Sequence, residues 1–529
     1  MNLLHDPLIR VRLRDGSTVR ESAETLPSLL EALGRDAVLG YPGIQKHQED
    51  AFHVFLCLLG GAALARSGLD SPVQERDYWQ DILLELAGDA GTTAWDLVSD
   101  DPTRPAFMQP PMSHDDWERA VSTRPIRTPD LLDLLPTARN HDLKRMRAIH
   151  AHPDAWIFAL VSLQTMSGYL SKQYRGICRM NSGFGSRMIA EVIHSQDPGA
   201  RWRHAVVRLG THRASVVPGP WGYSPRGMVL VWTSPWDGES SLPLSSLDPF
   251  FIEVCRRVRL QADGQRILAL VLPSRKQRIA CAELKGNVGD AWLPIDVTRD
   301  DGPAAVTAPQ DGLGVSLLHR LVFSQGIQGT VLHEPLASVA GDVHFSVSVL
   351  VGGQGKTAGF HHALVPVPAD VRSRLFAPTT AGSWRQRAAG LGRLALEDAD
   401  RMRRKVLKPA VFGLVQGGAD GIRLANDTVD AWWTHVDRRF HQMWKDQYFP
   451  WLWSLGDECS AERDLPRWHM ILTGAARRAF TIAEETLPHP SGRRYRALAT
   501  SSSRFERALA REFPVLEETS DDHAGTSGT

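Results

Sequence analysis

The amino-acid sequence predicts an α+β protein: a large mixed α/β N-terminal domain with short strands over residues 1–370, an all-α four-helix bundle over residues 371–514, and a disordered acidic tail over residues 515–529. Three observations predict this organisation. A chain of 529 residues is too long for one small core. Helix-like and strand-like apolar patterns alternate before Pro368. After Pro368, prolines become rare and apolar residues recur at helical spacing, until the small and acidic residues of the tail leave nothing to bury.

The N-terminal region begins with a strand and continues with helices. Residues 9–13 alternate between apolar and basic side chains, and Asp15-Gly16 then predicts a turn. Apolar residues three and four apart predict helices over residues 26–33, 46–65 and 73–86. Residues 101–130 are rich in proline and polar residues and predict an irregular connection, and residues 155–173 predict a further apolar helix.

From about Trp202 to Pro366 the patterns predict short strands separated by loops rich in Gly, Pro and Asp. The clearest strands are expected at residues 228–232, 267–272 and 345–351. The bundle follows. Its first apolar stripe has spacings of four, four, three and four, and three further stripes are separated by Gly417-Gly418, the loop at Gly456 and the turn at residues 489–492. The first stripe consists of Leu391, Ala395, Ala399, Met402 and Val406.

Charge and cysteine content limit the classes of function. Sixty basic residues balance sixty acidic ones, so any attraction to nucleic acid must come from local patches. The five cysteines have neither metal-ligand nor disulfide spacing, which fits a reducing cytoplasm. The N-terminus lacks the features of a signal peptide, and the longest apolar run, residues 54–65, is shorter than the ~20 residues that span a bilayer. We expect a cytoplasmic protein with no membrane partner.

Residues 350–357, LVGGQGKT, resemble a phosphate-binding P-loop but depart from it at the first position. Gly355-Lys356-Thr357 would require glycine at residue 350, where the chain has leucine. Pro366 and Pro368 also prevent the long helix that a P-loop must open. Because residues 343–349 alternate in polarity, the stretch predicts a strand, a glycine-rich tip and a second strand. A tip that carries Gln354, Lys356 and Thr357 suits phosphates or base edges of nucleic acid.

A second glycine-rich loop, RMNSGFGSR at residues 179–187, has arginines at both ends. Its glycines allow close approach of the backbone to a ligand, Phe184 can stack on a base, and the arginines can hold phosphate. A plain connecting loop is the alternative interpretation.

A third loop, KGNVGDAWLP at residues 285–294, places Lys285 and Asn287 on a turn that we expect burial of Trp292 to anchor. Nearby Arg275, Lys276 and Arg278 make the region basic, and a solvated charge cluster is the alternative.

Residues 137–147 hold four cations together with His141-Asp142, a pair found at the centre of metal-dependent phosphohydrolase sites. That chemistry needs further His and Asp ligands, and the sequence supplies no convincing set. A Gly-x-Ser-x-Gly nucleophile motif is also missing. We therefore predict neither a bound metal nor a cofactor.

Taken in order, these loops resemble the large subunit of the type I-E CRISPR surveillance complex Cascade, usually called CasA. The resemblance begins at NLLHDPLIRV, residues 2–11, and ends at the tip at residues 352–357, over about two-thirds of the chain. It also includes SPWDG at residues 234–238 and LDPFFIEVCRRVR at residues 247–259.

The resemblance implies a non-enzymatic, RNA-guided antiviral protein that recognises the protospacer-adjacent motif in double-stranded DNA, helps to open the duplex and recruits a helicase-nuclease. Its implied partners are guide RNA, the other Cascade subunits, target DNA and that nuclease. The implied DNA contacts are Asn181, Ser182, Gly183, Phe184, Gly185, Arg187, Lys285, Gly286, Asn287, Gln354, Gly355, Lys356 and Thr357, with the last four forming a wedge between the strands. The implied contacts to guide RNA or neighbouring subunits are Asn140, His141, Lys144 and Arg145.

Two other classes of function remain open from the residues alone. One is an enzyme, either a nucleotide hydrolase using Lys356 and Thr357 or a phosphohydrolase using His141 and Asp142. The other is an assembly scaffold that does not bind the motif.

Overall fold

The computed structural model describes residues 1–133, 151–181, 187–353, 356–378, 380, 382–418, 422–423, 427–488 and 491–514, with the backbone alone at 352, 353, 356–358, 427, 428 and 491. The chain divides into two compact units. Unit 1 consists of Met1–Leu313 and Gly326–Pro366, and unit 2 of Gly314–Gln325 and Val367–Thr529. Unit 2 therefore includes a short segment from within the N-terminal region, which no sequence pattern indicated. The predicted tail at residues 515–529 lies outside the described residues.

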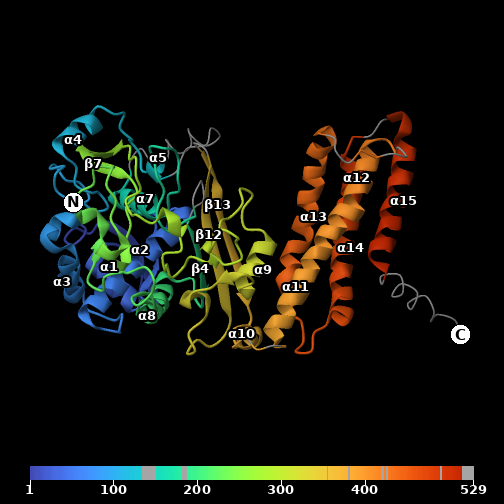
Figure 1. Ribbon diagram of the computed structural model, residues 1–529, viewed down its shortest axis with the longest axis horizontal. Coiled ribbons are helices and arrows are strands. Elements are labelled where there is room, and N and C mark those ends of the chain that lie inside the picture. The colour runs from blue at the N-terminus through green and yellow to red at the C-terminus, as the bar shows by residue number, and fades with distance from the viewer. Residues whose placement is uncertain are drawn as a thin grey trace. The chain divides into compact units, whose positions relative to one another are not determined.

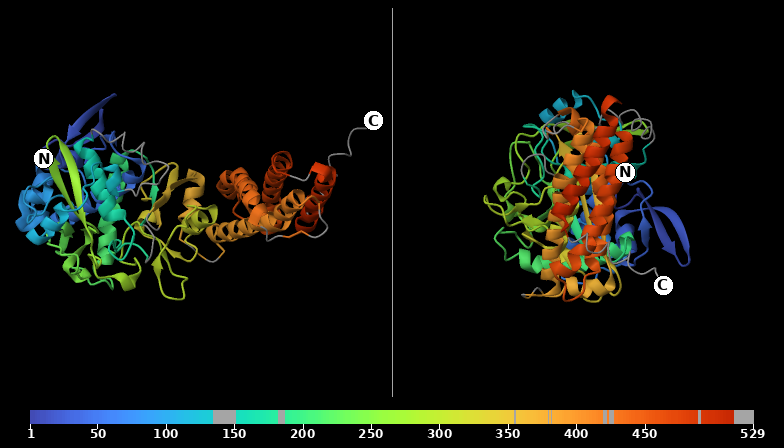
Figure 2. Two further views of the ribbon diagram at one scale, coloured as in Figure 1. Left: turned by 90° about the horizontal axis from the view of Figure 1, so that it is seen from above. Right: turned by 90° about the vertical axis from the view of Figure 1, so that its right-hand side faces the viewer.

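Unit 1 begins with the predicted hairpin. Strands β1 (Ile9–Asp15) and β2 (Thr18–Glu24) pair antiparallel around Gly16, whose φ of 58° suits the tight turn, and β3 (Val38–Gly40) completes the sheet in the order β2-β1-β3. This hairpin projects from the body of unit 1 (Figure 2).

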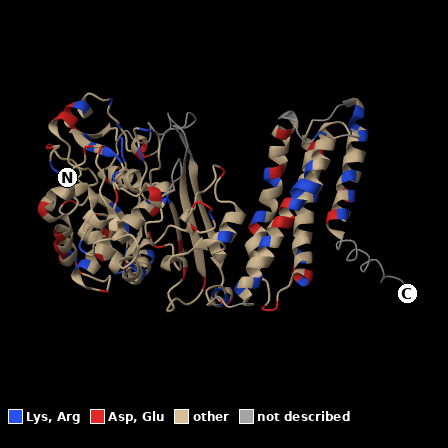
Figure 3. Cartoon of the chain, viewed as in Figure 1, with Lys and Arg blue, Asp and Glu red and all other residues tan. Residues whose placement is uncertain are grey.

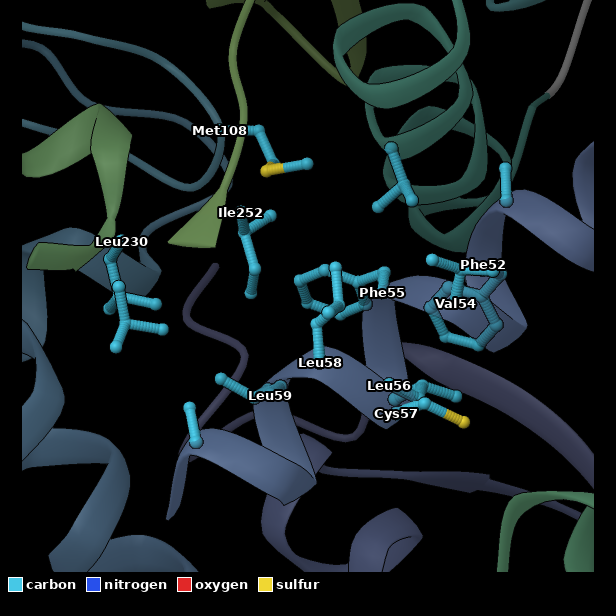
Figure 4. Packing of buried hydrophobic residues seen from close by; sticks show 14 of the residues in the cluster. Phe52, Val54, Phe55, Leu56, Cys57, Leu58, Leu59, Met108, Leu230 and Ile252 are labelled. Carbon is cyan, nitrogen blue, oxygen red and sulfur yellow. The ribbon is translucent and has the colours of Figure 1, made fainter. Parts of the chain in front are cut away.

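The helices of unit 1 surround a core built on one of them (Figure 1). They are α1 (Leu26–Gly34), α2 (Lys46–Ser67), α3 (Arg76–Ala87), α4 (His114–Val121), α5 (Asp130–Asp133), α7 (Pro153–Met166) and α8 (Pro198–Val216). Helix α2 buries almost its whole length, and Phe52, Phe55 and Leu59 pack in the main apolar cluster shown in Figure 4. Among the described residues only α2 is long and apolar enough to cross a membrane, but 83% of that stretch is buried inside the protein, as in an ordinary core helix.

The remaining strands of unit 1 are short, as predicted, except in one sheet. That sheet has the order β13-β12-β4 and consists of β4 (Met188–Ile193), β12 (Val343–Gly353) and β13 (Lys356–Val367). The smaller sheets are β5 (Met228–Leu230) with β6 (Leu247–Ile252), β7 (Arg257–Asp263) with β8 (Arg266–Leu272), and β9 (Ile295–Asp296) between β10 (Ala304–Ala305) and β11 (Ile327–Gln328).

Several expectations for unit 1 need correction. Residues 101–130 are not wholly irregular, because Ser113 caps α4 by accepting a hydrogen bond from the backbone N–H of Asp116. The stretch after Trp202 is not all strand and loop, since α8 extends to Val216. Helix α7 ends at Met166, where the chain reaches Ser167 and Gly168, rather than at residue 173.

Unit 2 confirms the predicted bundle. In its described part, four long helical segments are separated by the predicted glycine-containing turns, and they run side by side with acidic and basic residues interspersed (Figure 3). They are α11 (Trp384–Arg401) continued through a π-helical turn (Met402–Leu407) into α12 (Lys408–Val415), then α13 (Asp427–Trp453), α14 (Ala461–Thr486) and α15 (Arg494–Glu512). The shorter helices α9 (Val315–Phe323) and α10 (Ala369–Leu375) belong to the same unit.

Candidate nucleic-acid interface

The β13-β12-β4 sheet determines where two of the predicted loops lie. Strand β12 pairs antiparallel with β4 from His344↔Ile193 to Val349↔Met188. The chain enters β4 at Met188 directly after the glycine-rich loop, while β12 continues past Val349 to Gly353 and returns as β13 from Lys356. The glycine-rich loop and the hairpin tip are therefore connected to the same end of the sheet, and Gly353 lies about 13 Å beyond Val349 at the usual rise per residue.

The arginines at both ends of the glycine-rich loop make buried ion pairs. Arg179 Nε lies 2.8 Å from Asp290 Oδ2, Arg187 makes an ion pair with the same carboxylate, and Arg179 Nη1 lies 3.7 Å from Glu253 Oε2. Burial alone would raise the pKa of Asp290, but Arg187 and Arg179 hold it below its ordinary value. The Arg187 side chain is 1% exposed. The described partner of Arg187 is thus a buried acid of the 285–294 loop, and its contact with DNA stays a prediction.

The turn at Lys285 has an unusual backbone that brings it against the glycine-rich loop. Lys285 and Gly286 both have positive φ, 49° and 87°. A Cβ on Gly286 would lie 2.7 Å from Ala305 Cβ and 2.8 Å from the carbonyl carbon of Met180, so only glycine fits. Met180 directly precedes Asn181, the first residue of the predicted DNA contacts. The structure thus brings the Lys285 turn and the start of the glycine-rich loop into contact.

Lys285 is held at the surface by an exchangeable ion pair. Its Nζ lies 2.7 Å from Asp301 Oδ2 and donates to the Asp301 carbonyl at 2.7 Å, and the side chain is 27% exposed. Hydrogen bonds from Arg299 and Lys285 hold the pKa of Asp301 below its ordinary value. Because exposed ion pairs contribute only about 0–1 kcal/mol, Lys285 can exchange Asp301 for another acceptor at little cost.

Asn287 and Trp292 complete this turn. The Asn287 carbonyl accepts a hydrogen bond of 2.7 Å from Trp221 Nε1, and Trp292 is fully buried as predicted. The basic residues upstream differ in exposure. Arg275 and Lys276 are exposed, whereas Arg278 is buried beside Trp236. The solvated-cluster interpretation is therefore wrong for Arg278 only.

A buried polar network supports the sheet beneath these loops, and no sequence pattern revealed it. Arg201 on α8 donates to Asp50 of α2 at 2.6 Å and to Glu191 of β4 at 2.5 Å. Ser348 of β12 donates to Asp50, and Trp292 Nε1 donates to Glu191 at 3.1 Å. Burial would raise the pKa of Glu191, but Arg201 and His53 hold it well below its usual range. The network therefore links the β12 hairpin to the Lys285 turn through charged groups.

The other predicted site residues are less completely described. Lys356 and Thr357 begin strand β13, as the strand–tip–strand interpretation predicted, and not a helix, so they lack the helix N-terminus of a P-loop. Ser182, Gly183, Phe184, Gly185, Gln354 and Gly355 lie outside the described residues, as do Asn140, His141, Asp142, Lys144 and Arg145. Within the described ranges, no group of His, Cys, Asp and Glu side chains could hold a metal ion.

Comparisons with known proteins find similarity at the level of structure. No family model matches the sequence, and no curated protein matches it. Among solved structures, the CasA of Thermus thermophilus is similar with a TM-score of 0.62 and 16% identity, over 97% of this chain and 99% of that chain. The Cse1 of Acidimicrobium ferrooxidans is similar with a TM-score of 0.57 and 15% identity, over 97% and 98%.

A chain in a structure described as a CRISPR RNA-guided surveillance complex is also similar, with a TM-score of 0.61 and 14% identity over 97% and 99% of the two chains. These similarities extend over both units and not only over the loops. The chain therefore has the fold of the CasA, or Cse1, proteins.

Proposed function

We propose that this chain is a non-enzymatic subunit of an RNA-guided antiviral DNA surveillance complex in the cytoplasm. In that role it recognises a protospacer-adjacent motif in double-stranded DNA, helps to open the duplex for pairing with the guide, and recruits a helicase-nuclease. Its partners are guide RNA, the other subunits of the complex and target DNA. The similarity in fold to CasA and to a chain of a surveillance complex supports this proposal.

The observation that carries the proposal is the clustering of loops at one end of the β13-β12-β4 sheet. Gly286 lies against the backbone of Met180, and the register of β12 with β4 directs β12 towards the end of the sheet where β4 begins. Small, backbone-rich loops can enter a DNA groove that larger side chains would block, and a single lysine finds acceptors on several base pairs. In our assignment, residues 181–185 and 285–287 contact the motif.

The hairpin tip, residues 354–357, acts as the wedge. Opening the first base pairs costs on the order of ~1.4 kcal/mol per step, so a few contacts are enough to start pairing with the guide. The buried network between Ser348, Asp50 and Arg201 gives this hairpin a rigid base. We assign Asn140, His141, Lys144 and Arg145 to guide RNA or to neighbouring subunits.

Replacing Lys285 tests the motif contact. Lys285→Ala should weaken binding of the assembled complex to a motif-bearing duplex and reduce its preference over a motif-free duplex, while guide RNA stays bound. A lost groove contact is worth about 1–3 kcal/mol, or roughly 5- to 150-fold. The control is Arg35→Ala, which removes another cation held by exposed ion pairs, with Glu31 and Glu75. Equal motif preference in the two variants would refute the assignment.

A second experiment separates the proposal from an enzyme. ATP with Mg²⁺, or Mn²⁺ alone, would raise the melting temperature of the full chain if it bound a nucleotide or metal, because a ligand of the folded state stabilises it. We expect no shift with either. A shift that Lys356→Ala abolishes would instead support a nucleotide hydrolase.

A further inference from the structure

A pocket of about 550 Å³ lies beside the two motif loops, between chain segments 169–181 and 275–283. Asn181 lines the pocket and begins the glycine-rich loop, and Glu283, another lining residue, precedes Lys285 by two positions. The volume is within the range of small-molecule sites, about 300–1,000 Å³. A ligand that contacted both loops would thus have the pocket directly next to it.

The pocket has an apolar floor and a cationic rim. Its floor is formed by the buried side chains of Cys178, Met180, Ile279 and Cys281. Arg175, Arg275 and Lys276 contribute the positive charge, against the single acid Glu283 among the lining residues. Such an arrangement suits a ligand with an anionic part and a flat or apolar part.

The cations of the rim are available to a ligand. The Arg275 side chain is 80% exposed, and its ion pair with Glu239 is 3.5 Å long and lies at the surface. Lys276 is exposed and forms no ion pair with the residues that the structure describes. Arg175 donates from Nε to the Arg275 carbonyl at 3.0 Å and stacks 5.5 Å from the centre of the Tyr169 ring. This contact places an aromatic ring next to a guanidinium among the residues that line the pocket.

We propose that this pocket takes one nucleotide of the target DNA next to the motif, with its phosphate on Arg275 and Lys276 and its base or sugar on the apolar floor. Guanidinium and ammonium groups neutralise phosphate, while aromatic and apolar surfaces accept bases regardless of sequence. The proposal rests on the proposed function, and it adds to the motif contacts an anchor that does not read sequence.

The test compares two double variants in the assembled complex. Arg275→Ala with Lys276→Ala removes the rim, and Arg226→Ala with Arg266→Ala removes two exposed cations elsewhere in unit 1 as a matched control. Affinities for motif-bearing and motif-free duplexes are measured over a range of salt concentrations. The rim variant should lose affinity for both duplexes by the same factor, on the order of tenfold at ~0.1 M salt, and the slope of log K against log[salt] should become shallower by about 0.9, the value for one phosphate contact.

The outcomes distinguish this proposal from the motif assignment. If the rim variant behaves like its control while Lys285→Ala reduces motif preference, the pocket proposal is wrong and the proposed function stands. If neither variant changes DNA binding, both are wrong. A filling variant, Ala280→Trp, keeps the charge and should reproduce the loss of affinity. A last measurement adds thymidine monophosphate to the chain and to the rim variant and follows the melting temperature. If the nucleotide raises the melting temperature only when the rim is intact, while the rim variant binds DNA normally, the pocket is a site for free nucleotides and the proposal is overturned.

Discussion

The two units of this chain are stabilised in different ways. The bundle of unit 2 is filled with aromatic side chains, among which Trp468 packs against Trp444, Tyr448 and Trp451 and donates a hydrogen bond to the Ala395 carbonyl. The loop region of unit 1 instead depends on buried ion pairs, with Asp290 between two arginines and Arg201 between two acids. Apolar packing gives unit 2 regular helices, whereas the charges of unit 1 join the ends of irregular loops to buried acids.

This difference implies different responses to mutation. Removing one member of a buried ion pair leaves an uncompensated charge, which costs more than most changes of surface residues. The loops proposed to meet DNA should therefore be sensitive to residues that never touch it.

The largest expected effect concerns Asp290. Asp290→Ala leaves Arg179 and Arg187 buried without that carboxylate, and we expect unit 1 to lose about 3–5 kcal/mol of unfolding free energy. Denaturant unfolding followed by a probe in each unit would measure this, with the transition of unit 2 as internal control. A loss below about 1 kcal/mol would mean that the ion pairs do not anchor the loop.

Unit 2 should respond to pH through one buried histidine. His319 contacts Tyr448 Oη at 2.8 Å and the Ala389 carbonyl at 3.1 Å, and burial lowers its pKa to about 4. In the unfolded chain the His319 imidazole has a pKa near 6.5. Between pH 4 and 6.5 the unfolded state therefore binds more protons than the folded state does. The contribution of neutral His319 to the unfolding free energy of unit 2 is fully present above about pH 6.5. It decreases as the pH falls towards 4, by up to about 3 kcal/mol.

Unfolding of unit 2 at a series of pH values would check this, with His319→Gln as the comparison. The variant should flatten the pH dependence between pH 6.5 and 4. An unchanged profile would assign the dependence to other groups.

A smaller effect is expected at Gly286. Gly286→Ala should destabilise unit 1 by about 1–3 kcal/mol, because its φ of 87° and its contacts with Met180 and Ala305 leave no room for a Cβ. Gly302→Ala is a matched control, since its φ of 92° is similar but nothing lies within 4 Å of the added Cβ. If both variants lose the same stability, close packing between the loops contributes nothing beyond backbone strain.

Sequence patterns predicted the regular parts of both units. Apolar spacing located α2 and the four bundle segments, and alternation located β12. Strand β6 was missed because all of its side chains are buried, which removes the alternation. Strand β7 was not predicted, although Arg257-Val258-Arg259-Leu260 alternates as residues 9–13 do. Its arginines are buried, and Arg259 donates to the backbone carbonyls of Asp101 and Arg104, which the alternation did not indicate.

For the candidate site, the sequence indicated the loops but not their partners. Glycines and basic residues pointed to residues 179–187 and 285–294, yet Asp290 and Arg187 are 103 residues apart and Ser348 and Asp50 are 298 apart. Local patterns cannot reveal pairs at such separations. For the same reason, the sequence suggested that Arg187 faces a ligand and did not indicate its described partner in the protein.

The most direct test is photocrosslinking of the assembled complex to a motif-bearing duplex, with the modified residues mapped along this chain. We expect crosslinks from the motif base pairs within residues 181–185 and 285–287, and from the first opened pair within residues 354–357. Crosslinks confined to other surfaces of unit 1, or to unit 2 alone, would contradict the proposal that these three loops meet DNA together.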